Sequence, residues 1–291
     1  MCRFLVMVRK LSKKEAPVTS SQTEGLSTGA GVESALSCQE LKKSFMGVAA
    51  VTGATFDVPK GMITALIGPN GAGKTTIVNT LSGMMKSDSG AMQLGTVDVT
   101  NWESYKIARL GLMRTFQLSR ELGGLTVLEN LLVAPKHQAG ESLFNIFLRP
   151  RLAKREELEN TKRALEILRT YGLFDLRDNR ASELSGGQKK LLEIARAVMA
   201  QPKVLLLDEP MAGVNPALIE RIGGYILDLK SQGVTVLMVE HNLNVVEKIC
   251  DHVIVLAEGR TLATGRLSDL RANPEVVQAY LGEVINASTT R

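Results

Sequence analysis

The sequence predicts an α/β fold with a mostly parallel sheet and a glycine-rich loop between one strand and its helix. Three observations support this. Gly68–Thr75 read Gly-Pro-Asn-Gly-Ala-Gly-Lys-Thr, which matches G-x-x-x-x-G-K-[ST]. This loop follows a short aliphatic run at 62–67 and precedes a helical pattern at 76–81. Later apolar runs alternate with helical patterns, as expected when helices cover both faces of a parallel sheet.

Composition places the chain among ordinary globular proteins. Of its 291 residues 44% are hydrophobic and 22% are charged, enough for one large α/β domain or two small ones. No apolar run approaches the roughly 18–20 residues that span a bilayer, and no cleavable signal pattern is visible. The cysteines Cys2, Cys38 and Cys250 lack metal-ligand spacing, so we expect free thiols in a reducing cytosol.

The formal charge of +5 is confined to the beginning of the chain. Residues 1–14 contain five basic residues and no acidic one, so residues 15–291 sum to zero. A surface that binds nucleic acid should carry its excess charge on the folded body. We therefore expect no nucleic-acid partner. Residues 1–14 are interpreted as an extension or as the result of a start codon assigned too early, with Met7 as the alternative; weak attraction to anionic lipid is the rival.

The first half of the chain is expected to contain a linker and then strands. Residues 15–33 are rich in Ser, Thr, Gly and Glu, which is typical of a linker. The ordered domain should begin near Leu36, with antiparallel strands up to Pro59. The strand and helix around the glycine-rich loop occupy about 62–83, and residues 90–100 resemble a hairpin.

Helices dominate from about 119 to 183. Four residues on one face predict an amphipathic helix there, namely Leu158, Thr161, Leu165 and Leu168. Ser185 is a predicted N-cap. The helix after it has an apolar face made of Leu191, Ile194, Ala195 and Val198.

The last third is expected to alternate strands and helices. Val204–Leu207 is a continuous apolar run followed by acids, the pattern of a buried parallel strand. Asn215-Pro216 is a cap followed by proline at the first helical position. The helix that it opens should bury Ile219, Ile222, Ile226 and Leu229. Residues 234–239 and 253–256 are two further predicted strands, and no internal repeat is visible.

The glycine-rich loop predicts binding of a nucleoside triphosphate. Glycines let backbone N–H groups turn inward around phosphate oxygens, and the following helix directs its positive end at the anion. Lys74 can reach the β- and γ-phosphates, and the Thr75 hydroxyl can bind Mg²⁺. The predicted nucleotide-binding residues of this segment are Gly68, Pro69, Asn70, Gly71, Ala72, Gly73, Lys74, Thr75 and Thr76.

A phosphate loop alone leaves kinase, GTPase and ATPase readings open, and the acids that close the run at 204–207 help to choose among them. Asp208 is placed to hold the Mg²⁺ shell. Glu209, one residue later, can polarise a water in line with the γ-phosphate. No Asn-Lys-x-Asp motif for reading guanine occurs, which disfavours a GTPase.

A second anion-binding feature and a histidine complete the set of motifs. Leu184–Gln188 read Leu-Ser-Gly-Gly-Gln, so backbone N–H groups are exposed at a helix start. Because one loop already covers one triphosphate, this second feature needs another target. His241 follows the run at 234–239, where a neutral imidazole can donate to a γ-phosphate or orient the attacking water. His137 and His252 lack such a setting and are taken as structural.

These motifs, in this order over residues 36–283, resemble the nucleotide-binding subunit of an ABC transporter. The resemblance implies an ABC-type ATPase that uses ATP and Mg²⁺. It also implies that Gln117 touches Mg²⁺ and takes part in catalysis, that Phe45 stacks on adenine, and that Gly213–Asn215 form the D-loop, with Asn215 where most relatives have Asp. It further implies contacts to the nucleotide of a second cassette from Ser185, Gly186, Gly187 and Gln188.

The resemblance also implies a division of the chain. We expect an extension or linker at 1–35, a nucleotide-binding core with an antiparallel β subdomain at 36–118 and 191–283, an inserted helical subdomain with the signature motif at 119–190, and a tail at 284–291. A second cassette, either an identical copy or a paralogue, would complete the two ATP sites of a head-to-tail dimer.

Within the family, the chain is most similar to the longer type of ATP-binding subunit of branched-chain (hydrophobic) amino-acid importers. Arg-Thr-Phe-Gln at 114–117, the helical insert after Leu118, Ala-Gly-Val-Asn-Pro at 212–216 and the ending at 277–282 carry this similarity. It implies membrane permease subunits, an extracytoplasmic substrate-binding protein and a peripheral position on the cytoplasmic face of a bacterial inner membrane. The alternatives are the ATPase of a lipopolysaccharide or lipid exporter, a soluble ABC-type ATPase outside transport, and a scaffold that does not hydrolyse ATP, which the complete catalytic set disfavours.

Overall fold

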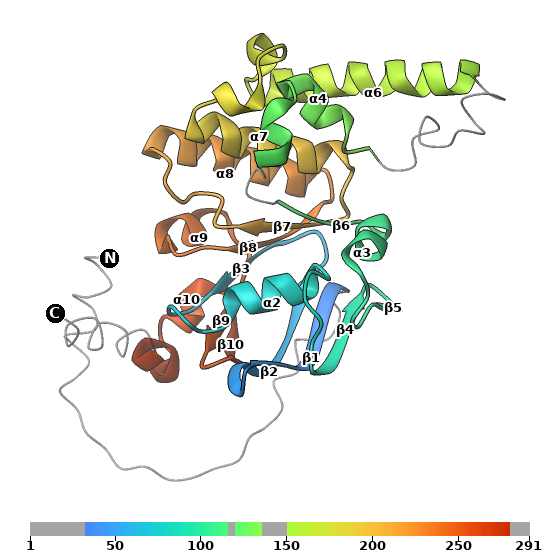
Figure 1. The fold of residues 1–291 in the computed structure, drawn as a ribbon. Coiled ribbons are helices and arrows are strands. Elements are labelled where there is room, and N and C mark those ends of the chain that lie inside the picture. The colour runs from blue at the N-terminus through green and yellow to red at the C-terminus, as the bar shows by residue number, and fades with distance from the viewer. Residues whose placement is uncertain (1–32, 116–119, 136–149, 280–291) are drawn as a thin grey trace, which may run out of the picture.

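The computed structural model describes residues 33–115, 120–135 and 150–279. They form an α/β fold around one mixed sheet of ten described strands in the order β5-β4-β1-β2-β10-β9-β3-β8-β7-β6 (Figure 1). The expected α/β architecture with antiparallel and parallel regions is therefore confirmed. Within the described ranges, no helix is both long enough and apolar enough to cross a bilayer.

One end of the sheet is antiparallel. Its strands are β1 (Ser34–Phe45), β2 (Val48–Pro59), β4 (Ser89–Leu94) and β5 (Val97–Asp98). β1 pairs antiparallel with both β2 and β4, and β4 pairs with β5. The strands expected between 36 and 59 and the hairpin expected at 90–100 are confirmed.

The other end is mostly parallel and contains the strand that precedes the phosphate loop. Its strands are β3 (Ile63–Ile67), β6 (Leu112–Arg114), β7 (Val204–Asp208), β8 (Thr235–Val239), β9 (His252–Ala257) and β10 (Arg260–Gly265). β3 lies between β8 and β9 and runs parallel to both. All five residues of β3 are buried, so the phosphate loop begins from the centre of the sheet.

The side chains of β7 alternate between two hydrophobic cores, one on each face of the sheet. Leu205 and Leu207 belong to the core shared with the helices drawn above the sheet in Figure 1. Val204 and Leu206 belong to the core shared with α2 and the antiparallel strands. Because successive side chains point to opposite faces, a strand buried on both sides is apolar at nearly every position.

The helices occupy the bounds that follow. They are α2 (Lys74–Leu81), α3 (Ser104–Leu110), α4 (Val127–Leu132), α6 (Pro150–Thr170), α7 (Gly186–Met199), α8 (Pro216–Ser231), α9 (Leu243–Ile249) and α10 (Leu267–Leu270), with 3₁₀ turns η1 (Arg120–Gly124), η3 (Phe174–Leu176) and η4 (Ala181–Glu183). Helices α4, α6, α7 and α8 share one core with the sheet.

The apolar face predicted for the long helix is wrong at its N-terminal end. In α6, Leu168 is fully buried and Leu165 is half-buried, but Leu158 is 55% exposed. The buried positions are Ala164 and Leu168. Leu158 lies more than two turns before Leu168, and among the described residues no core cluster extends to it.

The other helix predictions hold. Ser185 caps α7, whose predicted face is buried or half-buried, and Asn215 caps α8 with proline at the first helical position. Ile222, Ile226 and Leu229 are buried as expected, and Ile219 is half-buried. The strands β6 and β10 and the helix α9 had no individual prediction.

Candidate functional site

The phosphate loop follows β3 and contains two glycines, Gly68 and Gly73, at positions with no room for a side chain. A Cβ added to Gly68 would lie 2.2 Å from the Leu256 carbonyl oxygen of the neighbouring strand β9. Gly73 caps α2 with φ 92°, in the left-handed region, and its added Cβ would lie 2.6 Å from the Ala50 carbonyl oxygen. Tight packing against two other strands therefore fixes the shape of the loop.

Lys74 and Thr75 begin α2, directly after the loop. Lys74 is buried, and its Nζ donates to the carbonyl oxygens of Gly68 and Pro69 at 2.7 and 2.8 Å. These bonds hold the ammonium group inside the loop. Thr75 is exposed beside it, so its hydroxyl is accessible to a ligand. These are the two residues that the sequence predicts to contact phosphate and Mg²⁺.

Asp208 ends β7 and is joined to α2 through an arginine. Arg114, at the end of β6, donates from Nη2 to Asp208 Oδ2 at 2.7 Å. Its Nη1 donates to Asn79 Oδ1 at 2.6 Å and to Ser82 Oγ at 3.2 Å. Only 9% of the Arg114 side chain is exposed. This residue links β6, α2 and the end of β7, a function that sequence reasoning missed.

Glu209 and His241 come together at the ends of adjacent strands. β7 and β8 are parallel, with Asp208 paired to Val239, so the residues that follow them meet at the same edge. Glu209 Oε1 lies 2.9 Å from His241 Nε2, and both side chains are 45% exposed. Glu209 also has φ 49°, and its N–H donates to the Val239 carbonyl at 3.1 Å. The structure thus brings two predicted catalytic residues into hydrogen-bond contact.

A buried carboxylate, Glu240, lies beside this pair and was not identified from the sequence. It is 4% exposed. Oε1 accepts the Met211 backbone N–H at 3.0 Å, and Oε2 accepts those of His241 and Asn242 at 3.2 and 3.4 Å. Burial raises the pKa of Glu240, while these backbone donors and His241 lower it. A charged residue at the end of an apolar strand was the only sequence signal for it.

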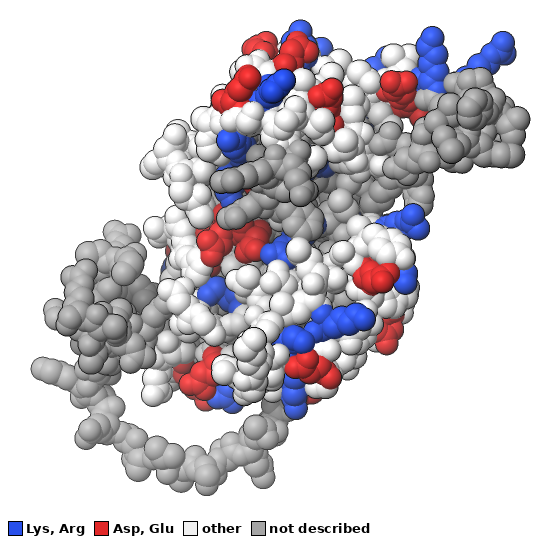
Figure 2. All heavy atoms as spheres, in the orientation of Figure 1, with Lys and Arg blue, Asp and Glu red and all other residues white. Residues whose placement is uncertain are grey.

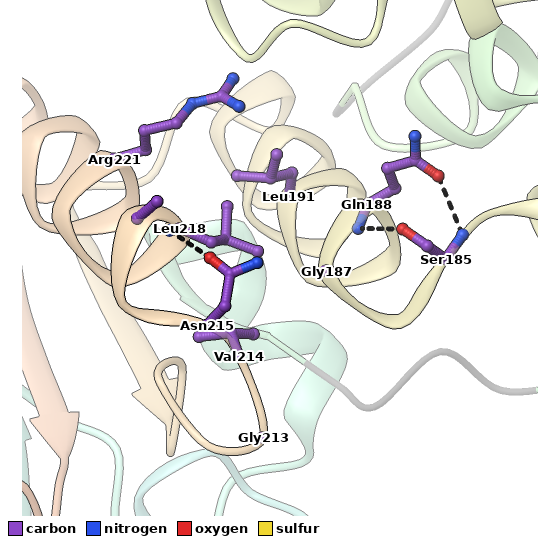
Figure 3. Close-up of a pocket in the computed structure, with 10 residues that line it drawn as sticks. Ser185, Gly187, Gln188, Leu191, Gly213, Val214, Asn215, Leu218 and Arg221 are labelled. Carbon is purple, nitrogen blue, oxygen red and sulfur yellow. Dashed lines mark hydrogen bonds between the residues drawn. The ribbon is translucent and has the colours of Figure 1, made fainter.

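The segment Leu184–Gln188 opens α7 through a capping box. The Ser185 hydroxyl accepts the Gln188 N–H at 3.3 Å, and the Gln188 side chain accepts the Ser185 N–H at 2.9 Å (Figure 3). This arrangement satisfies helix donors that otherwise lack partners. Both residues therefore shape the start of the helix, and Gln188 uses its side-chain oxygen in the cap.

The two glycines of this segment, Gly186 and Gly187, have different surroundings. A Cβ on Gly187 would lie 2.5 Å from Leu218 Cδ2 of α8, whereas a Cβ on Gly186 would meet nothing within 4 Å. Gly187 therefore permits close packing of α7 on α8, and Gly186 leaves the start of α7 open. The sequence alone does not distinguish the two glycines.

A pocket of about 440 Å³ lies between the start of α7 and the start of α8 (Figure 3). Ser185 and Gly187 line it from one side, and Gly213, Asn215 and Arg221 from the other. Asn215 points its amide oxygen at its own helix and accepts the Leu218 N–H at 2.9 Å. Leu184–Gln188 and Gly213–Asn215 of one chain therefore contribute to a single surface.

The remaining predicted residues are placed as follows. Phe45 ends β1 and is 43% exposed, with Lys43 Nζ 5.8 Å from its ring centre, so the aromatic ring is partly accessible. Gln117 lies outside the described residues, as does His137. His252 begins β9 opposite Thr64, at the start of β3, and hence at the sheet edge away from the phosphate loop.

The oxygen donors at the loop suit a magnesium ion shared with phosphate. Thr75 offers a hydroxyl and Asp208 a carboxylate, both hard ligands. Within the described residues, no group of three or more His, Cys, Asp or Glu could hold a metal by itself. Mg²⁺ typically binds through one or two protein oxygens and completes its shell with phosphates and water. The residues present fit that arrangement.

The face of the molecule shown in Figure 2 has acidic and basic side chains close together near its centre. Elsewhere on that face charges of both signs are interspersed. Asp208, Glu209, Lys74 and Arg114 supply charges of both signs at the site itself. Such a mixture suits an anionic phosphate chain that is held through both lysine and a metal ion.

Comparison with known proteins finds a matching family and similar proteins. The profile of the ABC transporter family matches residues 51–212. The chain is 45% identical over 247 residues to a probable branched-chain amino acid transport ATP-binding protein, LivG, of Archaeoglobus fulgidus, covering 85% of this chain and 95% of that protein. It is 39% identical over 249 residues to the high-affinity branched-chain amino acid transport ATP-binding protein LivG of Escherichia coli, covering 85% and 98%.

Solved structures have the same fold. The ADP conformation of MJ1267, an ATP-binding cassette of an ABC transporter, superposes with a TM-score of 0.73 at 38% identity, covering 86% of this chain and 99% of that one. A dimeric post-hydrolysis state of the cassette MJ0796 bound to ADP and Pi gives a TM-score of 0.65 at 25% identity, covering 80% and 98%.

Proposed function

The chain belongs to the ABC transporter ATPases, and from this premise we propose that it drives uptake of branched-chain or other hydrophobic amino acids. The proposal of ATP hydrolysis depends on one observation: Glu209 contacts His241 at 2.9 Å. This contact lies at the end of the sheet where β3 leads into the phosphate loop. The amino-acid part is supported by the names of relatives that are 45% and 39% identical over almost their whole length.

ATP would bind across the phosphate loop and the end of β1. The loop N–H groups and Lys74 would hold the β- and γ-phosphates, and Phe45 would stack on the adenine. Thr75 and Asp208 would hold Mg²⁺, together with Gln117. When bound, the ion neutralises charge that develops on the phosphates.

Hydrolysis would use Glu209 as the base for the attacking water. Its carboxylate is 45% exposed, so it can contact a water beside the γ-phosphate. His241 Nε2 fixes one carboxylate oxygen at 2.9 Å, which leaves the other oxygen to accept the proton. His241 would thereby hold the base in the orientation that in-line attack requires.

A second cassette would complete each site. The open surface at Gly186 and the capping box of Ser185 and Gln188 present the start of α7 to a partner. In a head-to-tail dimer this start would cap the γ-phosphate held by the other chain. Closure then depends on ATP and is released by hydrolysis, which gives a cycle of movement.

That movement would act on permease subunits in the membrane, with the chain bound peripherally at the cytoplasmic face. An extracytoplasmic substrate-binding protein would deliver the amino acid. The relatives named for this transport occur in archaea and in bacteria. Purification of the tagged chain with its partners, described below, identifies the permeases. It also shows whether the partner cassette is an identical copy or a paralogue.

Substitution of Glu209 tests the catalytic assignment. Glu209→Gln keeps size and removes the base, so ATP binding should remain, dimer should accumulate and hydrolysis should fall by at least about 10²-fold. Size-exclusion chromatography with ATP and a phosphate-release assay measure both properties. Normal hydrolysis by the variant would show that Glu209 is not the base. Lys74→Ala serves as the control that loses nucleotide binding.

Purification of the tagged chain from gently solubilised membranes tests the transport assignment. Two multispanning permeases of the amino-acid type and a second ATPase would support the proposal. Permeases of a lipid exporter would retain the ATPase and refute the substrate. A chain recovered only from the cytosol, without permeases, would refute the role in transport.

A further inference from the structure

Glu240 connects the two loops that carry Glu209 and His241. Its Oε1 accepts the N–H of Met211, two residues after Glu209, and its Oε2 accepts the N–H of His241. One side chain therefore bonds to the segment after β7 and to the segment after β8. We propose that Glu240 is a positioning residue that keeps Glu209 and His241 in contact during ATP hydrolysis, an inference that rests on the function proposed above.

The three bonds require a carboxylate. All three partners are backbone N–H donors, and a carboxylate is an acceptor at both oxygens. An amide of the same shape offers one oxygen and one NH₂ group. In Glu240→Gln, the amide must place its NH₂ against the Met211 N–H or against the N–H groups of His241 and Asn242. One of the two loops then loses its bond.

The surroundings make this loss consequential. Glu240 is 4% exposed, so water has little access to a donor that loses its partner. A buried N–H without an acceptor is costly, and the backbone moves to find one. Bonds to a charged acceptor in such a setting are stronger than those between neutral groups. The carboxylate therefore restrains both loops more firmly than the amide can.

The effect should appear in turnover. Glu240 holds the backbone N–H of His241 itself and that of Met211, two positions after Glu209, so it restrains the backbone on both sides of the Glu209–His241 contact. A misplacement of about 1 Å in a catalytic group can cost about 10²-fold in rate. The residues expected to hold phosphate, such as Lys74 and Thr75, belong to α2, whereas the bonds of Glu240 go to the segments after β7 and β8. Nucleotide binding should thus be preserved.

Steady-state kinetics of Glu240→Gln test the proposal. We expect kcat to fall about 10- to 100-fold while KM for ATP stays within about two-fold. In the background of His241→Ala, the same change should cost less than about three-fold, because residues that act as a unit are not additive. Unchanged kcat, a parallel loss of ATP binding, or a full additional loss without His241 would each overturn the proposal.

Asp251→Asn is the matched control. Asp251 also accepts a backbone N–H of the central sheet, from Ile63 at 2.9 Å, but at the opposite end of β3. Its change from carboxylate to amide should leave kcat within about two-fold of the wild type. Hydrolysis by the wild-type chain tests the proposed function separately, so a normal rate in Glu240→Gln refutes only the positioning role.

A shorter acid provides a second test that keeps the charge. Glu240→Asp can still accept from its neighbours His241 and Asn242 but is one methylene too short for the bond to Met211. If Glu240→Gln does not fold, this variant should fold and lose kcat with KM preserved. Full activity of Glu240→Asp would show that the link between the loops is dispensable and would overturn the proposal.

Discussion

Removal of Arg114 should destabilise the fold and do so most strongly when Mg²⁺ and nucleotide are absent. The guanidinium bonds to Asp208 at 2.7 Å and to Asn79 at 2.6 Å. Arg114→Met keeps much of the aliphatic volume and deletes both the charge and the bonds. Asp208 then keeps a negative charge in a site that is only partly open to solvent.

The magnitude follows from burial. Removing one partner of a fully buried pair costs about 3–5 kcal/mol. Because the Asp208 side chain is 28% exposed, solvent screening reduces this to about 2 kcal/mol. Loss of the bonds to Asn79 and Ser82 adds about 1 kcal/mol. For a chain of this size, about 3 kcal/mol corresponds to a fall in Tm of roughly 6–12 °C.

Thermal unfolding followed by circular dichroism measures this fall. Arg155→Met is the control, because its pair with Glu159 is highly exposed, at 77% and 61%, and should cost less than about 0.5 kcal/mol. Addition of Mg²⁺ with a non-hydrolysable ATP analogue should narrow the gap between Arg114→Met and the wild type, since the ion supplies positive charge at Asp208. Equal Tm losses in the two variants would refute the reasoning.

Three further outcomes are expected. Gly187→Ala must displace the Leu218 side chain, whose Cδ2 would lie 2.5 Å from the new Cβ, so it should raise Tm less than Gly186→Ala, whose Cβ meets nothing within 4 Å. Gly186→Ala should weaken the ATP-dependent dimer; equal behaviour of the two variants in both assays contradicts this. Asn215→Ala should cost about 1 kcal/mol in urea unfolding by removing the cap of α8, and Asn215→Asp should cost little. Phe45→Ala should raise KM for ATP about tenfold with kcat retained, while Phe45→Tyr stays near the wild type; an unchanged KM in Phe45→Ala excludes stacking.

Patterns confined to a short stretch could be predicted well from the sequence. The runs at 62–67 and 204–207 could be identified as buried strands because a strand covered on both faces is almost continuously apolar; Thr64 is a buried polar residue within β3. The caps at Ser185 and Asn215 could be identified because a cap depends on neighbours within three residues. The phosphate loop could be identified for the same reason.

Features that depend on distant partners could not be predicted. Arg114 reads as an ordinary basic residue until β6 lies beside β7 and its side chain reaches Asp208, 94 positions later. Glu240 reads as a strand-end acid until Met211 approaches it. The same limit explains Leu158, whose helical spacing is correct but whose exposure depends on how far the other helices extend.

The backbone at Glu209 has a further consequence for how the chain can be stabilised. Its φ of 49° lies in the left-handed region, which costs a side chain with a Cβ on the order of 1 kcal/mol and costs glycine almost nothing. Glycine is thus the more stable residue at the position where a carboxylate is needed for hydrolysis. Selection for thermal stability alone would therefore favour a chain with glycine at this position, which still binds nucleotide but no longer hydrolyses it.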